Sequence, residues 1–189
     1  MRRSGCLFRA VSVTMLVFFL ISVPSLVTAD VVSGKVVSDD TLEQDWGWIN
    51  IMGGILQHTF TLTNGGQDNL ILKGGFTSCG CTNIIITLPD GSKSPVFTMT
   101  HSNTAPPANW VGIVKPGENF KVTVDYDPLT HGPNALGPVE RRAYIISSAP
   151  EDGRLSVKLP AVRNGTVTIL RVSGVVVSEE TYKQKEQKD

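Results

Sequence analysis

The stretch Lys115-Pro116-Gly117-Glu118-Asn119-Phe120-Lys121-Val122-Thr123-Val124-Asp125-Tyr126 decides the fold class of this chain. Proline presets φ for the first central position of a turn and glycine accepts the positive φ of the second, so the first four residues predict a turn. From Phe120 onward, every second residue is apolar, which places Phe120, Val122, Val124 and Tyr126 on one side of a β-strand. The pattern indicates a strand with one face on a core and the other in water.

Other short windows repeat this alternation between turn-forming residues. In residues 56–62 the even positions are mostly apolar, and Asn64-Gly65-Gly66 then turns the chain. Further strands are predicted at 31–37 as an edge strand, and at 70–72, 84–87, 142–147, 155–159 and 167–177. No long window shows apolar residues at helical spacing. Short strands without helical crossovers predict an all-β chain, folded as an immunoglobulin-like sandwich of two antiparallel sheets.

The N-terminus has the parts of a secretory signal. Arginines at positions 2, 3 and 9 precede an apolar stretch at 10–23, and Val27 and Ala29 lie at positions −3 and −1 of a cleavage site before Asp30. We therefore expect residues 1–29 to be a signal helix that is removed together with Cys6. The alternative is an uncleaved leader that tethers the protein to a membrane. In both cases the rest of the chain is exported, to the periplasm, the cell surface or the medium.

The remaining chain is long enough for one domain. Residues 30–177 are expected to form the sandwich, and the charged run at 178–189 is expected to be a disordered tail because it has little to bury. The formal net charge is +0 at pH 7 and no basic block occurs in this portion. These features argue against nucleic acid as a partner, and against membrane contact beyond an uncleaved leader.

Beyond the leader, the chain has two cysteines, in Ser78-Cys79-Gly80-Cys81-Thr82. On an extended chain both sulfurs point to the same face, where they can bond to each other, hold a soft metal or fill space. A Cys79–Cys81 disulfide is feasible because Gly80 permits a local kink, and its short loop predicts a labile bond. The residues alone leave these readings open, although two buried thiols or a passive bridge are the commonest outcome.

Copper or zinc binding by Cys79 and Cys81 would need further ligands. Met99 and His101 share one face of a predicted strand and are the candidates for that role, whereas His58 is expected to be a core histidine bonded to backbone. His131 lies in a glycine- and proline-rich loop. A redox role needs a thiol that ionises readily, and no helix is predicted after Cys81 to favour it. Without such support, the default expectation is no cofactor.

The order of these landmarks resembles a bacterial family of exported immunoglobulin-like domains, the domain-of-unknown-function family 1573. The stretches that carry the resemblance are Asp45-Trp46-Gly47, His58-Thr59-Phe60-Thr61-Leu62-Thr63-Asn64-Gly65-Gly66, Ser78-Cys79-Gly80-Cys81-Thr82 and Lys115-Pro116-Gly117-Glu118. With the strand Val122-Thr123-Val124-Asp125-Tyr126 that follows, the resemblance runs from about residue 46 to residue 177. The resemblance implies an immunoglobulin-like fold and an exported location, without a settled activity. Relative to that family, 90–112 and 129–138 are insertions, the first expected to be a loop or an extra hairpin and the second an irregular surface segment.

The sequence lacks a nucleophile elbow, a His-Glu-x-x-His motif and a glycine-rich phosphate loop. We therefore expect a non-enzymatic exported module that binds an unidentified protein or cell-envelope component through a sheet edge or its loops. Trp110 is a candidate aromatic contact, unless it packs beneath its own loop. The alternatives are a periplasmic copper- or zinc-binding or redox carrier that uses Cys79 and Cys81, and a periplasmic assembly chaperone that lends an edge strand.

Overall fold

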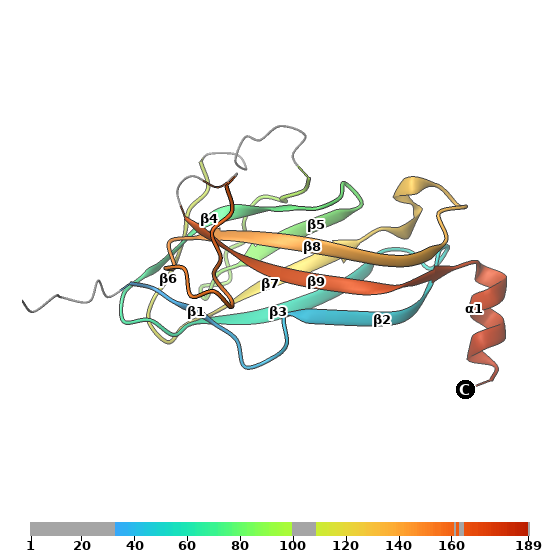
Figure 1. Cartoon of the computed structure of the whole chain (residues 1–189), viewed down its shortest axis with the longest axis horizontal. Helices are drawn as coiled ribbons and strands as arrows, with labels where there is room; N and C mark the ends of the chain where they lie inside the picture. The colour runs from blue at the N-terminus through green and yellow to red at the C-terminus, as the bar shows by residue number, and fades with distance from the viewer. Residues whose placement is uncertain (1–32, 100–108, 161, 163–164, 189) are drawn as a thin grey trace, which may run out of the picture. The chain divides into compact units, whose positions relative to one another are not determined.

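The computed structural model describes residues 33–99, 109–160, 162 and 165–188. The chain divides into two compact units, Met1–Asp30 and Val31–Asp189, and all described residues belong to the second. This second unit is built from two β-sheets, and Figure 1 shows one sheet in front of the other. The predicted signal helix lies outside the described residues.

The first sheet has the strand order β1-β3-β7-β5, and all its pairings are antiparallel. Its strands are β1 (Val36–Val37), β3 (Leu56–Asn64), β5 (Thr82–Thr87) and β7 (Asn119–Tyr126). β7 is the strand predicted from the strongest alternation in the sequence. Its four alternate apolar residues, Phe120, Val122, Val124 and Tyr126, are all buried, which confirms the predicted inward face.

The second sheet has the strand order β2-β9-β8-β4-β6. Its strands are β2 (Glu43–Asn50), β4 (Leu70–Thr77), β6 (Gly112–Val114), β8 (Gly137–Ser147) and β9 (Thr166–Val177). β2 pairs with β9 in parallel, so this sheet is mixed, whereas two antiparallel sheets were predicted. Between β1 and β2 the chain changes sheets, so β2 is not the return arm of a hairpin and is free to pair in parallel.

The main core lies between the two sheets. Its buried side chains come from both sheets and from the segment that follows β5: Phe60, Leu62, Ile84, Ile86, Phe120, Val122, Leu70, Leu72, Ala143, Ile145, Leu170 and Phe97. A second, smaller cluster consists of Ile49, Ile51, Cys81, Tyr126 and Val176. The predicted all-β immunoglobulin-like sandwich is thus confirmed, with its alternating residues turned inward.

Three segments differ from the sequence-based expectation. Residues 155–159 contribute one antiparallel bridge, Val157 to Val167, rather than a strand, and the edge strand predicted at 31–37 is described only as β1. Where a disordered tail was predicted, α1 (Glu179–Glu186) is a helix without buried residues. Ser178 caps it by accepting a hydrogen bond from Thr181 N, and acidic residues in its first turn and lysines in its last turn suit the helix dipole.

Asn64, at the end of β3, links the segment before β1, the turn that follows β3 and the strand β6. Its Oδ1 accepts hydrogen bonds from the N–H groups of Lys35 and Gly66, both at 3.0 Å. Its Nδ2 donates to the carbonyl oxygens of Asp68 at 2.8 Å and Val114 at 2.9 Å. A Cβ on Gly66 would run into the carbonyl oxygen of Ser33, so the turn after Asn64 needs glycine there.

Asp152 organises the loop between β8 and β9, and its removal is expected to cost about 1 kcal/mol of stability. Its Oδ1 accepts hydrogen bonds from the N–H groups of Arg154, Leu155 and Ser156 at 2.9, 2.9 and 2.8 Å. Burial raises the pKa of Asp152, but these N–H groups outweigh burial and hold the pKa below its usual value.

Because the folded-state pKa is lowered, this contribution is complete above the unfolded-state pKa of about 3.9 and is lost as the pH falls through the folded-state value. The Asp152→Ala variant should therefore differ from the parent in urea denaturation at pH 7, and the difference should shrink below about pH 4. Glu151→Ala is the neighbouring control. A difference that is equally large in acid would contradict the role given to the carboxylate.

Candidate functional site

The two cysteines lie in the turn that joins β4 to β5, which carries the chain from the second sheet to the first. The N–H of Thr82 donates to the carbonyl of Cys79 at 3.1 Å and closes this turn. The hydroxyl of Thr77 lies 2.8 Å from the Cys79 carbonyl oxygen and 2.9 Å from that of Thr82. The sulfurs are therefore presented by a fixed turn, not by the extended strand that the sequence suggested.

A disulfide joins Cys79 and Cys81, whose Cα atoms are 5.2 Å apart. The two residues differ in exposure, because Cys81 is 2% exposed within the smaller core cluster whereas Cys79 is only half-buried. The N–H of Cys81 also approaches the Cys79 sulfur at 3.2 Å. The pair thus has one buried sulfur and one that solvent reaches.

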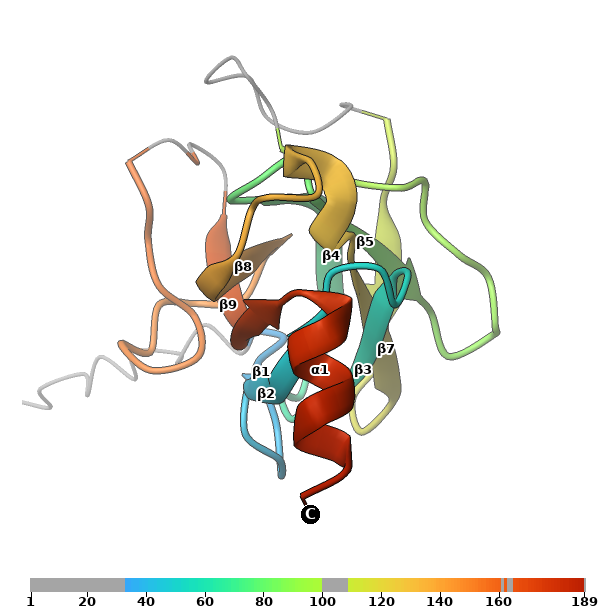
Figure 2. The same ribbon diagram turned by 90° about the vertical axis from the view of Figure 1, so that its right-hand side faces the viewer.

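His131 contacts this sulfur pair, although it is 52 residues from Cys79 in the sequence. It ends the short 3₁₀ helix η1 (Pro128–His131), which Asp127 caps by accepting a hydrogen bond from Leu129 N. The N–H of Asp127 donates to the Cys81 carbonyl at 2.9 Å, which ties η1 to the cysteine turn. As a result, His131 Nε2 lies 3.1 Å from Cys79 Sγ. Figure 2 looks at this end of the molecule, where η1 and α1 lie.

Arg141 reaches the second sulfur. Its Nε donates to Cys81 Sγ at 3.1 Å. Along β8, Arg141 occupies the same face as the buried Ala143 and Ile145, so it points inward. Of the salt bridges between described residues, none involves Arg141. An inward cation without a carboxylate partner is available to compensate negative charge on sulfur.

Arg141 packs on the Tyr126 ring, which in turn stacks on Trp46. Its guanidinium lies over the Tyr126 ring, 5.7 Å from the centroid, and Tyr126 stacks on Trp46 with centroids 5.9 Å apart. Burial raises the pKa of Tyr126, Arg141 acts to lower it, and Asp127 adds to the rise, so the phenol stays neutral at physiological pH. The stack holds the arginine in place beneath the sulfur pair.

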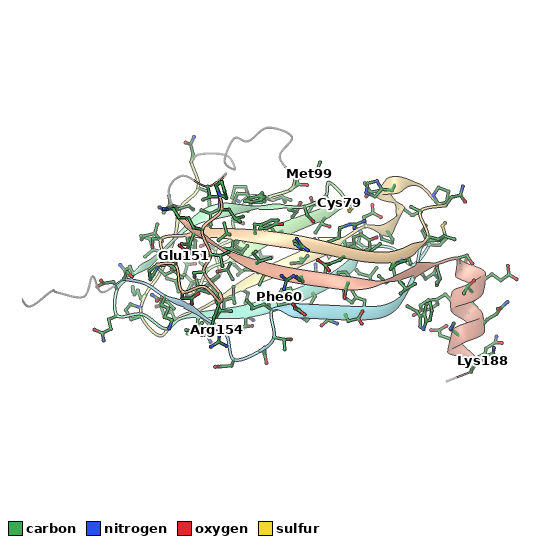
Figure 3. All side chains as sticks on the ribbon, viewed as in Figure 1. Phe60, Cys79, Met99, Glu151, Arg154 and Lys188 are labelled. Carbon is green, nitrogen blue, oxygen red and sulfur yellow. A yellow bond between two sulfur atoms is a disulfide. The ribbon has the colours of Figure 1, made fainter. Side chains whose placement is uncertain are left out.

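The other residues predicted from the sequence lie elsewhere or outside the described part. Met99 is half-buried, two residues beyond Phe97, which bridges to β5 at Ile84, and Figure 3 labels Met99 along the same side of the view as Cys79. Its predicted companion, His101, lies outside the described residues. The histidine that does approach the cysteines is His131, which lies in a loop without periodic residues.

The surroundings of Trp110 and His58 differ in part from those that the sequence predicted. Trp110 is half-buried and packs edge to face on Phe97, with ring centroids 5.8 Å apart, so it belongs to the rim of the core. His58 packs edge to face on Phe60 at 4.6 Å. Among the hydrogen bonds of the described residues none involves the His58 ring, so the expected bond to backbone is not present.

A second feature is a groove of about 430 Å³ between the link before β2 and the strand β3. Its lining residues are Ser38, Asp39, Asp40, Thr41, Glu43, Gln44, His58, Thr59, Phe60 and Thr61. β1 pairs with β3 only at Thr63 and Asn64. From Leu56 to Leu62, the edge of β3 away from β7 therefore has no paired strand in the described part of the chain.

Among the described residues, no helix is long and apolar enough to cross a membrane.

No protein-family model and no curated protein matches the chain, so the resemblance to family 1573 stays a prediction. Among solved structures, a protein of unknown function from Porphyromonas gingivalis W83 is 13% identical with a TM-score of 0.48, over 75% of this chain and 46% of that one. The ASH/PapD-like domain 7 of human CEP192 is 13% identical with a TM-score of 0.41, over 90% and 99%. WR4, an MSP family member of Caenorhabditis elegans, is 12% identical with a TM-score of 0.37, over 76% and 97%. This chain spans less than half of the Porphyromonas protein, and these similarities concern the fold alone.

Proposed function

We propose that this chain is an exported, non-enzymatic immunoglobulin-like module that binds an extended segment of another protein as an added strand along β3. The observation that supports this proposal most directly is the open edge of β3 over residues 56–62, beside a groove. An unpaired edge offers a row of N–H and C=O groups, which an extended peptide can satisfy with its own backbone.

The backbone groups of alternate β3 residues point toward this open edge. Asn64 N donates to Glu118 O on the β7 side, so the even-numbered residues of β3 turn their backbone groups to β7. The Thr61 carbonyl accepts from the Ser38 hydroxyl at 3.5 Å on the opposite side. The N–H and C=O groups of Gln57, Thr59 and Thr61 therefore face the place where a strand would be added.

The other sheet edges are less suited to strand addition. β5 is bridged on its outer side by Phe97 and Lys93. β2 has a shift of register between Asp45 and Trp48, and such bulges interrupt an edge. β1 and β6 have only two and three residues. β3 is unpaired on this side from Leu56 to Leu62 and has a regular register with β7, which makes it the longest uninterrupted open edge of the described chain.

The charge of the groove favours a basic segment. Asp39 and Asp40 lie in its wall, and neither takes part in the salt bridges between described residues, whereas Glu43 pairs with Arg171 at 2.7 Å. Phe60 lies at the inner side of the groove. We therefore expect a bound strand to place an apolar side chain toward Phe60 and a lysine or arginine toward the two aspartates.

Replacing Thr59 by proline is expected to weaken partner binding at least about tenfold, which corresponds to about 1.4 kcal/mol. Proline removes an N–H that faces the open edge and leaves the β3–β7 hydrogen bonds intact. The matched control is Thr59→Val, because both variants lose the 3.0 Å contact with the Thr123 hydroxyl and only proline loses the N–H. Circular dichroism would verify that both variants fold.

The partner is captured by a photo-crosslinking amino acid placed at Thr61, in the cells that produce the protein. The control position is Lys121, which pairs with Thr61 in register but lies one strand away from the edge. We expect crosslinks from Thr61 to one basic, strand-forming segment, and their loss with Thr59→Pro but not with Thr59→Val. Equal crosslinking from Lys121, or crosslinks that survive Thr59→Pro, would refute strand addition. Crosslinks to many different subunits in transit would favour the assembly chaperone instead.

A further inference from the structure

We propose that Cys79, Cys81 and His131, once the disulfide is reduced, bind one copper(I) ion. This site lies in the β4–β5 turn and η1 and shares no residue with the groove beside β3, so its test does not depend on the binding function proposed above. The proposal rests on the geometry of three donor atoms, on the softness of those donors and on the charge of Arg141.

The donor atoms are already gathered by the fold. The two Sγ atoms and a ring nitrogen of His131 all lie within 4.8 Å of one another. The hydrogen bond from Asp127 N to Cys81 O and the cap at Leu129 N fix η1 against the cysteine turn. Little backbone rearrangement is therefore needed for the three atoms to surround one ion. Thiolate sulfur and imidazole nitrogen in a three-donor set suit copper(I).

The charge of Arg141 favours copper(I) over zinc(II). Two thiolates and a neutral imidazole around a monovalent ion leave one negative charge, which the guanidinium hydrogen-bonded to Cys81 Sγ compensates. Around zinc(II) the same donors would be neutral, leaving the inward Arg141 without a counter-charge. Zinc would also need a fourth ligand to complete its tetrahedron.

Access to the site is through its outer members. His131 is exposed and Cys79 is half-buried, whereas Cys81 and Arg141 lie on the inner side. An incoming ion would thus meet Cys79 and His131 first and Cys81 last. Such a path allows copper(I) to be exchanged with another soft-donor carrier without unfolding the sandwich.

Metal binding requires a preceding reduction, which needs an external dithiol. One thiolate of the dithiol attacks a sulfur of the Cys79–Cys81 bond, and its second thiolate then releases the mixed disulfide. The dithiol is oxidised to a disulfide and the two cysteines become thiols, so two electrons and two protons are transferred. Copper(I) then displaces the two thiol protons, which leave to solvent.

The test uses the full chain, reduced with dithiothreitol, freed of reductant under nitrogen and titrated with copper(I) against the chromogenic chelator bicinchoninate. We expect one copper per chain, with X-ray absorption showing two sulfur neighbours and one nitrogen. Cys79→Ser and Cys81→Ser should each abolish binding. Arg141→Gln should weaken it by about tenfold, in the range seen when metal sites lose a supporting group, and His131→Ala, which removes a ligand, by at least about 100-fold.

Two further variants make the test specific. Thr130→Ala changes the residue next to His131 in η1 and should leave the copper affinity unchanged. His101→Ala examines the histidine that the sequence alone favoured, and should also leave it unchanged. The proposal is overturned if reduced protein retains no copper, if the cysteine variants retain it, if His101→Ala weakens binding more than His131→Ala, or if zinc(II) displaces copper(I). Circular dichroism of each variant separates loss of binding from loss of fold.

Discussion

Replacing Phe120 by alanine is expected to lower the free energy of unfolding by about 3–5 kcal/mol. Phe120 is 1% exposed and lies on the central strand β7, opposite the fully buried Leu62 of β3. The loss combines the transfer of a large apolar side chain with the cavity that remains between the sheets. Urea denaturation followed by circular dichroism would measure it.

Lys121→Ala is the matched control for this variant. Lys121 is adjacent on the same strand but exposed, so its removal should change stability by less than about 0.5 kcal/mol. Phe120→Leu should cost less than the alanine variant, because it leaves a smaller cavity. If Lys121→Ala and Phe120→Ala were equally stable, Phe120 would not face the core between the two sheets.

Asn64→Ala is expected to destabilise the protein by about 3–5 kcal/mol, although it removes a polar side chain. Asn64 is completely buried and uses both donors and its acceptor oxygen. Alanine would leave the N–H groups of Lys35 and Gly66 and the carbonyl oxygens of Asp68 and Val114 without these partners. Each buried backbone group left unsatisfied costs about 1–3 kcal/mol. The melting temperature should fall by roughly 10 °C.

Two variants separate this network from a general effect of losing asparagine. Asn119→Ala removes an exposed asparagine that accepts one hydrogen bond, from the Thr63 hydroxyl at 2.7 Å, and should cost less than about 1 kcal/mol. Asn64→Asp keeps the acceptor oxygen but loses both donors, so it too should be strongly destabilising. Similar costs for Asn64→Ala and Asn119→Ala would show that the four bonds do not matter.

The sheets were predictable to the extent that their strands alternate. β7 has an apolar residue at every second position and β3 at most of these positions, so the prediction of their inward faces follows from the pleat alone. The parallel pairing of β2 with β9 was not predictable, because Glu43 and Arg171 meet across 128 residues. α1 was missed because its stability comes from a cap and charges at its ends, without an apolar stripe.

Only the cysteines of the site formed by Cys79, Cys81, His131 and Arg141 were predictable from the sequence. The spacing of Cys79 and Cys81 predicted that their sulfurs lie close together. His131 was not predicted to join them, because it is 52 residues from Cys79 in a loop without periodicity. Arg141 had a local signal that was overlooked. It interrupts the inward-facing series Val139, Ala143 and Ile145 of β8, and an arginine in such a position needs a hydrogen-bond acceptor. No pattern in the sequence identifies Cys81, 60 residues away, as the residue that Arg141 contacts.

The parallel pairing of β2 with β9 also affects the order in which the second sheet can fold. β9 is the last strand along the described chain, yet it lies between β2 and β8 inside the second sheet. Until residues 166–177 arrive, β2 has no neighbour in that sheet and β8 lacks one of its two. Assembly of the second sheet must therefore wait for β9, with closure of its most distant loop as the slow event. Until β9 is in place, the second sheet stays incomplete and the apolar faces of the sandwich stay open.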